Sequence, residues 1–382
     1  MQVNKVKAAV VGCGMISGIY LRNLSGKTGL FNSIEVVACC DLDAAAAERR
    51  AAEFGLKVMT LEEICASDEI EMVINLTTPA AHYGIIKKAL LAGKHVYTEK
   101  VMCVELDEAR ELVRLADEKG VYLGASPDTF LGSAVQNARQ IVESGLIGEV
   151  TSCHASVNRD YSLMPELIPY VVNRAGGIGF DVGIYYVTAL LNIMGPATRV
   201  SGIMRTRNPE RTHFMTKRDN FGDPYLMKSE NLAVGVMDFA SGAVGTLHFN
   251  SECIMNEQAH LILYGTQGIV FMGNPDHFGD EVKLLRKGQT EPVVIPANFG
   301  YSENSRGIGA AEMAWAIRRG RKHRASKEMA LHALEILFGV EISGREGRFY
   351  EIQSTFEKTP PLKPGYLNAG YYDSDPETSL VD

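Results

Sequence analysis

The chain has 382 residues, which is more than one hydrophobic core usually holds, so we expect two domains. Apolar residues make up 46% of the sequence, which excludes a disordered composition, and the net charge of −8 excludes the basic footprint of a nucleic-acid-binding protein. There is no 18-residue apolar run and no signal-peptide pattern at the N-terminus, so we expect a cytoplasmic protein with no membrane partner.

The first part of the chain alternates strand-like and helix-like stretches. The strand-like stretches are short apolar runs at 7–14, 33–43, 57–60, 71–79, 94–100 and 121–125. The stretches with helical spacing lie between them, at 15–24, 43–54, 80–93 and 106–120. This alternation predicts an α/β fold with a doubly wound parallel sheet, a Rossmann domain, over residues 1–130. Such sheets bind ligands at the carboxyl ends of their strands, so we examine the residues there.

The first strand ends in "GCGMIS", a G-x-G-x-x-S sequence that opens a helix. Glycines in this position let the backbone approach a pyrophosphate at the helix N-terminus, so Gly12, Gly14, Met15 and Ile16 are predicted to bind a dinucleotide. Ser17 replaces the third Gly or Ala of the pattern and is small enough to keep the helix close to the sheet. A purely structural tight turn is the alternative.

Asp41 ends the second strand and is predicted to accept hydrogen bonds from the adenosine ribose. A carboxylate repels a 2′-phosphate, so NAD is favoured over NADP. The spacing of 27 residues from Gly14 is longer than usual, and the polar "SGKTGLFNS" accounts for it as a loop. The alternative is that Asp41 caps the following helix.

Two further strand ends carry candidate cofactor contacts. The first is "TTPAAH", with Thr77, Thr78, Pro79 and His82, where Pro79 can start a helix at its first position. The second is "TEK", with Glu99 and Lys100. A plain strand-to-helix turn is the alternative for the first segment. Taken alone, Lys100 is an ordinary solvated lysine.

After about residue 130 the pattern changes to strands separated by tight turns. They lie at 149–161, 199–207, 231–239, 243–252, 259–265, 268–273 and 281–286. This predicts an α+β domain over 131–360 with a large, mainly antiparallel open sheet, one face apolar and the other polar. Helices near 177–194 and 308–343 are expected on the apolar face. Residues 205–230 are predicted to be a long loop, and 361–382 an extended tail.

The cysteines argue against cross-links. Seven are scattered along the chain, an odd number, and none form a C-x-x-C pair. That is typical of free or buried thiols in a reducing compartment, so we predict neither disulfides nor a metal site.

The layout resembles the glucose–fructose oxidoreductase/inositol dehydrogenase/MocA (Gfo/Idh/MocA) family over most of the chain. The resemblance rests on "GCGMIS", the acid at 41, "TTPAAH", "TEK" in place of E-K-P, and "GGIGFDVGIY" in place of GG-x-x-x-D-x-G-x-H/Y. Two positions depart from the commonest pattern. Val101 replaces a proline, which is expected to loosen the turn after Lys100, and Tyr185 stands where many members have histidine.

The resemblance implies an NAD(P)-dependent dehydrogenase that oxidises a secondary alcohol of a sugar or cyclitol by hydride transfer. It implies that Lys100 lies beside the nicotinamide and the reacting hydroxyl, that Tyr185 moves the proton and that Asp181 binds substrate. Asp181 and Tyr185 are one helical turn apart, so they should face the same way. One cation about 4 Å from a phenol, at an effective dielectric near 20, offers roughly the 4 kcal/mol needed to bring its pKa to about 7. Lys100 is therefore expected to favour the phenolate. The alternative is that Tyr185 is an aromatic on the core face of a helix.

Further residues are candidates to line the substrate pocket because they flank the glycine stretch. They are His154, Arg159, Asp160, Tyr161, Asn173 and Tyr186. Two other functions stay open: a lyase or hydrolase that recycles bound NAD through a transient keto-sugar, and a non-catalytic dinucleotide sensor. We also expect a homodimer or homotetramer.

Overall fold

The computed structural model describes residues 4–25, 29–256 and 260–362. The predicted tail therefore lies outside the described residues from 363 onward. In the described residues no helix is both long and apolar enough to span a bilayer.

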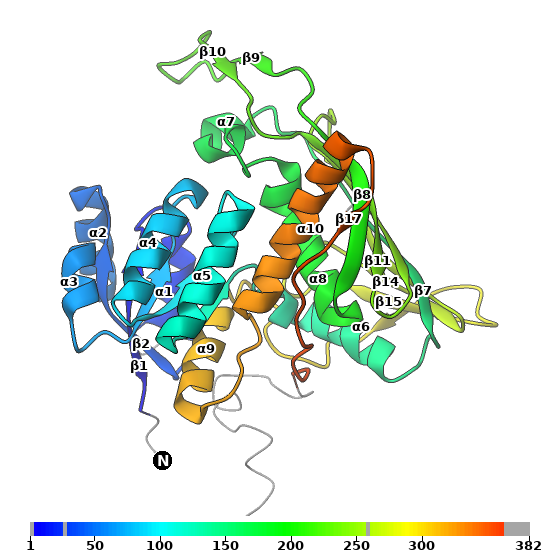
Figure 1. Cartoon of the computed structure of the whole chain (residues 1–382), viewed down its shortest axis with the longest axis horizontal. Coiled ribbons are helices and arrows are strands. Elements are labelled where there is room, and N and C mark those ends of the chain that lie inside the picture. The colour runs from blue at the N-terminus through cyan, green and yellow to red at the C-terminus, as the bar shows by residue number, and fades with distance from the viewer. Residues whose placement is uncertain (1–3, 26–28, 257–259, 363–382) are drawn as a thin grey trace, which may run out of the picture.

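The first sheet has six parallel strands in the order β3-β2-β1-β4-β5-β6, the doubly wound arrangement predicted from the sequence (Figure 1). Its strands are β1 (Val6–Val11), β2 (Ile34–Cys40), β3 (Lys57–Val58), β4 (Met72–Asn75), β5 (His95–Thr98) and β6 (Leu123–Ala125). Its helices are α1 (Ser17–Leu24), α2 (Ala44–Phe54), α3 (Leu61–Ala66), α4 (Pro79–Leu91) and α5 (Leu106–Lys119). Strand β4 is fully buried, and in β1 every residue but the half-buried Lys7 is buried, because helices cover both faces of a parallel sheet.

Helix α3 was not predicted, although a local signal announces it. The Thr60 hydroxyl accepts from the backbone of Glu63, whose carboxylate accepts from the backbone of Thr60. This capping box stabilises the first turn of even a short helix.

The second sheet has nine strands and is mainly antiparallel, as predicted. Its strands are β7 (Val150–Asn158), β8 (Ala197–Arg205), β11 (Leu232–Phe239), β12 (Val244–Asn250), β13 (His260–Gly265), β14 (Gly268–Met272), β15 (Val282–Arg286), β16 (Val293–Ile295) and β17 (Tyr350–Glu351). Strand β7 lies in the middle of the sheet and pairs in parallel with β12, so the sheet is not a simple meander. Alternation holds along β12: Leu247 and Phe249 are buried, whereas Thr246 is exposed.

Several helices connect or cover the two sheets. They are η1 (Thr129–Leu131), α6 (Ser133–Glu143), α7 (Met164–Leu167), η2 (Pro169–Val172), the π-helix η3 (Gly179–Gly183), α8 (Ile184–Met194), α9 (Ile308–Arg319) and α10 (Lys327–Glu346). Helix α10 packs on β8 and α8 and lies between the first domain and the second sheet in Figure 1.

The sequence predicted that helices within 308–343 would cover the apolar face of the second sheet. This is right for α10 and wrong for α9. Helix α9 packs on strands β1, β2, β5 and β6 of the first sheet. Gly309 permits this approach, because a Cβ there would overlap the hydroxyl of Tyr97 on β5. A division of the chain at residue 130 therefore does not separate the two cores, since a helix far beyond that residue packs on the first sheet.

The predicted loop at 205–230 contains a small hairpin. Its strands β9 (Glu210–Thr212) and β10 (Pro224–Leu226) pair antiparallel, and the hairpin projects beyond α7 (Figure 1). All seven cysteines are free thiols in the structure.

Candidate active site

The glycine loop after β1 leaves room for a ligand where the pattern requires it. Gly12 has φ of +101°, and a Cβ there would lie 2.7 Å from the carbonyl carbon of Leu76, so only glycine fits. A Cβ on Gly14 would meet nothing within 4 Å. The next residue, Met15, is 77% exposed. Ser17 is fully buried and donates to the Gly14 carbonyl at 2.6 Å, which holds the turn that opens α1.

Asp41 lies at the carboxyl end of β2, facing the glycine loop. One of its oxygens accepts from the Cys13 amide at 2.6 Å and the other from the Asp43 amide at 2.8 Å. The alternative of an Asp41 helix cap is wrong, because Asp43 caps α2 by accepting from Ala45. Arg50 also reaches this loop, with Nε 3.1 Å from the Ser17 hydroxyl. These residues fit the ribose and pyrophosphate of a dinucleotide.

The predicted contacts after β4 and β5 form one connected edge. Pro79 occupies the first turn of α4, as predicted. The side chain of Thr77 donates to Asn75 at 2.7 Å. His82 is fully buried, with Nδ1 2.6 Å from the carbonyl oxygen of Val101 and Nε2 3.0 Å from that of Thr77. His82 therefore ties the two strand ends together through its ring and is closed off from a ligand.

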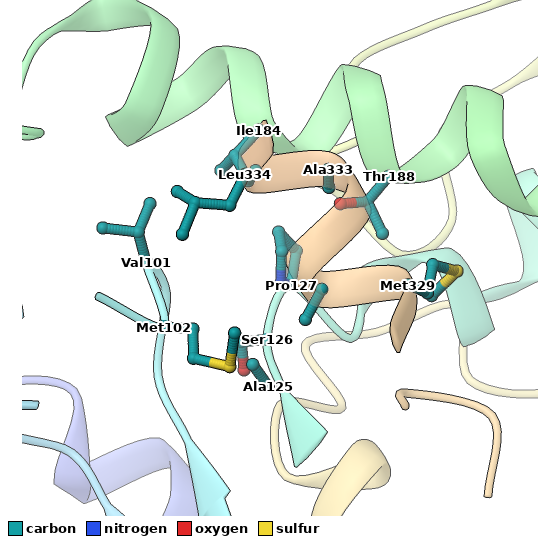
Figure 2. A pocket seen from close by; sticks show the side chains of 11 residues that line it. Val101, Met102, Ala125, Ser126, Pro127, Ile184, Thr188, Met329, Ala333 and Leu334 are labelled. Atoms are coloured by element: carbon teal, nitrogen blue, oxygen red, sulfur yellow. The ribbon is translucent and has the colours of Figure 1, made fainter. Parts of the chain in front are cut away.

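The turn after Lys100 is well held despite the missing proline. The Lys100–Val101 peptide is cis, Val101 is 3% exposed, and its carbonyl is held by His82. Figure 2 shows the Val101 side chain facing Ile184 of α8 and Leu334 of α10. These side chains leave a cavity of about 10 Å³, the lower limit for one water. The expectation that Val101 loosens this turn is wrong, because packing replaces the constraint that proline would supply.

Lys100 and Asp181 form a buried ion pair at the centre of the site. The Lys100 ammonium contacts an Asp181 carboxylate oxygen and donates to the Asp181 backbone carbonyl at 2.8 Å. Tyr161 and Tyr170 donate to the two carboxylate oxygens at 2.8 and 3.0 Å. Burial alone would raise the pKa of Asp181, but the Lys100 charge and these hydrogen bonds lower it. Burial likewise opposes the charge on Lys100, yet Asp181 raises its pKa well above the usual value.

Asp181 lies in the π-helix η3, a rare element that is frequent at functional sites. The two glycines that precede this π-helix are required by close packing within the protein. A Cβ on Gly176 would overlap the Tyr170 carbonyl, and one on Gly177 would overlap Glu230. Close packing against neighbouring chain segments therefore accounts for both glycines.

Tyr185 lies in the first turn of α8 and faces Lys100, whose ammonium lies 5.7 Å from the ring centre. Asp181 and Tyr185 thus share one side of the helix, as predicted. Burial and the charge of Asp276 raise the pKa of Tyr185, while Lys100 and Arg306 lower it. The expected influence of Lys100 has the right direction, but the net result is opposite, because burial outweighs it and Lys100 is already paired with Asp181.

Three residues of the site were not found from the sequence. Tyr170 lies in the 3₁₀ turn η2, and Asp276 and Arg306 lie in loops and pair at 2.6 Å. No periodicity or motif marks these positions, since each is brought to the site by the packing of distant segments. Among the residues that the structure describes, no cluster of His, Cys, Asp or Glu side chains is arranged to hold a metal ion.

Two family models cover most of these elements. The model described as "Oxidoreductase family, NAD-binding Rossmann fold" matches residues 6–126, and the Gfo/Idh/MocA C-terminal domain matches residues 135–271. The chain belongs to the Gfo/Idh/MocA family. The resemblance seen in the sequence is thereby confirmed, and so, at the level of the family, is an NAD(P)-dependent oxidoreductase.

Similar proteins include other oxidoreductases. An uncharacterised oxidoreductase of Schizosaccharomyces pombe is 29% identical over 205 residues, which are 53% of this chain and 55% of that one. This match spans only about half the length of that relative. A dTDP-3,4-didehydro-2,6-dideoxy-α-D-glucose 3-reductase of Streptomyces antibioticus is 28% identical over 295 residues, 75% of this chain and 82% of that one. The structure of levoglucosan dehydrogenase with NADH and levoglucosan superposes with a TM-score of 0.78 at 17% identity, covering 92% of this chain and all of that one (100%), which shows the shared fold.

In this Gfo/Idh/MocA member, only some of the other residues predicted to line the substrate pocket lie near Asp181. Tyr161 reaches Asp181, as described. Tyr186 is fully buried against Phe249, with ring centres 5.7 Å apart, which leaves no surface for a ligand. Asn173 is exposed beyond η2, and Asp160 is exposed in the turn after β7, where it accepts from Ser162 at 2.9 Å.

His154 lies elsewhere. It is a half-buried residue of β7, and its Nδ1 lies 2.8 Å from the hydroxyl of Thr246, its neighbour on β12, as in an ordinary strand histidine.

Proposed function

We propose that this chain is an NAD-dependent oxidoreductase that transfers a hydride between a secondary alcohol of a sugar or cyclitol and the nicotinamide. One observation carries the proposal: Lys100, Asp181 and Tyr185 converge at the carboxyl edge of the first sheet, although they come from two different parts of the chain. Family membership supports the reaction type, and the sugar-acting relatives support the substrate class.

The glycine loop fits a dinucleotide by its own geometry, since Gly14 opens onto free space and Asp41 lies at the neighbouring strand end. We assign Gly12, Gly14, Met15 and Ile16 to its phosphates and Asp41 to the ribose of NAD. When bound, the nicotinamide supplies the hydride acceptor.

The side chains of the protein then have separate tasks. Lys100 donates a hydrogen bond to the reacting oxygen and stabilises its developing negative charge. Asp181 holds the ammonium in place through the buried ion pair and is itself fixed by Tyr161 and Tyr170. Tyr185 is the proton-transfer group. Because burial raises its pKa, Tyr185 carries its own proton, which it can donate to the carbonyl oxygen of a ketone in the direction of reduction. In the direction of oxidation it first releases that proton and then accepts the one from the substrate hydroxyl, with Lys100 and Arg306 stabilising the phenolate.

A substrate panel tests the proposal. Aldoses, inositols, amino sugars and glycosides are each incubated with NAD or NADP, and nicotinamide reduction is followed by absorbance. We expect steady NADH formation with at least one polyol. Release of a substituent without net NADH would favour the lyase or hydrolase with recycled NAD, and cofactor binding without turnover of any compound would favour the sensor.

A further inference from the structure

Arg159 presents a positive charge that no carboxylate of the described residues neutralises. It follows directly after β7, where its amide donates to the Asn250 carbonyl at 2.9 Å. Its side-chain Nε is buried and has no hydrogen-bond partner among the described residues, and in the same part of the chain no carboxylate forms an ion pair with it. A buried guanidinium nitrogen without a partner is costly, so such a group usually serves a ligand.

The position of Arg159 places this charge at the candidate site. Arg159 precedes Tyr161 by two residues on the segment that follows β7, where the amides of Arg159 and Tyr161 donate to the carbonyls of Asn250 and Ser251 at 2.9 and 3.4 Å. In keeping with this position, its charge lowers the pKa of the Tyr161 phenol, against the effect of burial. Tyr161 is the residue that donates to Asp181 at 2.8 Å. Arg159 is therefore close to the ring that fixes the central carboxylate.

The other cations of the site are already paired. Lys100 is paired with Asp181, and Arg306 is paired with Asp276 at 2.6 Å. The Glu99 carboxylate accepts from the Tyr20 hydroxyl at 2.6 Å and from the Lys100 amide at 2.9 Å, so its hydrogen bonds are also provided. Arg159 is therefore the cation of this group for which the described part of the chain provides no carboxylate partner.

We infer that the substrate is an acidic sugar whose single carboxylate binds Arg159, an aldonate or a uronate. This inference rests on the proposed function and narrows its substrate class. A carboxylate matches both the planar fork and the single charge of a guanidinium. A phosphate ester brings a charge of about −1.5 to −2, which is more than one guanidinium balances.

Matched substrates and variants test this with the NAD-loaded protein. Glucose is compared with glucuronate and gluconate, galactose with galacturonate, and all of them with glucose 6-phosphate. Kinetics are measured for the wild type, Arg159→Lys and Arg159→Met, with Arg286→Met on the exposed end of β15 as the control.

We expect an acid to exceed its neutral parent by about 100-fold in kcat/KM, the worth of a buried charge pair. Arg159→Met should remove most of this preference, mainly through KM, and leave the neutral sugar within about threefold. Arg159→Lys should restore part of it. The control should match the wild type.

Three results would overturn the inference: equal use of acids and neutral sugars by the wild type, an equal loss on both in Arg159→Met, or a preference for glucose 6-phosphate. Calorimetric titration of glucuronate into the protein with NADH bound separates this question from the proposed function. Arg159-dependent binding without turnover would support the inference and sink the proposed reaction. Oxidation of neutral sugars with no role for Arg159 would do the reverse.

Discussion

Glu230 holds the turn that carries Asp181, and replacing it should change how stability depends on pH. Its side chain is buried and accepts from the amides of Gly179 and Phe180 at 3.0 and 3.4 Å. Burial raises its pKa to about 7, although these hydrogen bonds oppose the shift. The folded protein thus holds a proton on Glu230 in a range where the unfolded chain releases it.

The sign and size of the effect follow from this shift. Between about pH 4.5, the usual value, and about pH 7, the folded state binds more protons than the unfolded state, so the free energy of unfolding falls as the pH rises. The shift corresponds to roughly 3 kcal/mol, fully present below pH 4.5 and lost above about pH 7. Glu230→Gln keeps a carbonyl oxygen for Gly179 and cannot ionise. Relative to the wild type, it should gain up to about 3 kcal/mol between pH 5 and pH 8.

Urea unfolding at pH 5, 6, 7 and 8 measures this difference, with the exposed Glu149→Gln as the control. A constant difference between Glu230→Gln and the wild type across the series would refute the reasoning, because Glu230 would then ionise alike in both states. Glu230→Ala removes the acceptor altogether. It leaves two buried amides unsatisfied and should cost about 1–3 kcal/mol at every pH, together with much of the activity that depends on Asp181.

The remaining predictions concern the site and the assembly. Tyr185→Phe should keep the fold and NAD affinity but lower turnover about 10²–10⁴-fold; Lys100→Met should cost at least as much, and the double variant should be little worse. Near-normal turnover in Tyr185→Phe, with unfolding in Tyr185→Ala, would make Tyr185 a core aromatic. Calorimetry should show tighter binding of NAD than of NADP because of Asp41; equal or tighter NADP binding would point to Arg49 or Arg50. Light scattering at micromolar concentration should show a dimer or tetramer, since the outer face of the second sheet exposes apolar side chains such as Val236 (39% exposed), and a monomer would end this idea.

The elements of the first sheet could be predicted because each has a local cause. Apolar runs define buried strands, and the rule for parallel sheets places the ends of β1, β2, β4 and β5 at one edge. Gly12, Asp41, Thr77 and Lys100 were chosen as candidates in this way. The pairing of β7 with β12 could not be predicted, because strand order within a sheet depends on partners far along the chain.

The charge state of Tyr185 shows why a site cannot be derived from its motif residues alone. A cation close in the family pattern suggests a lowered pKa, but the pattern does not report burial or a carboxylate such as Asp276. Nor does the pattern show that the Lys100 ammonium is already paired with the Asp181 carboxylate. A pKa is set by all charges and by solvent access together, and both exist only in the folded chain.

The placement of Arg306 shows how the fold builds the part of the site that the sequence does not announce. Asp128, 2% exposed in the loop after β6, accepts from the amides of Gly307 and Gly309 at 2.9 and 3.1 Å and so anchors the start of α9. Gly309 lets this helix approach Tyr97 on the first sheet. Arg306 immediately precedes the anchored turn, and its charge reaches Tyr185. A buried carboxylate of the first domain thus fixes the N-terminus of a late helix. The charges around Tyr185 therefore depend on a contact between segments separated by 179 residues of the chain.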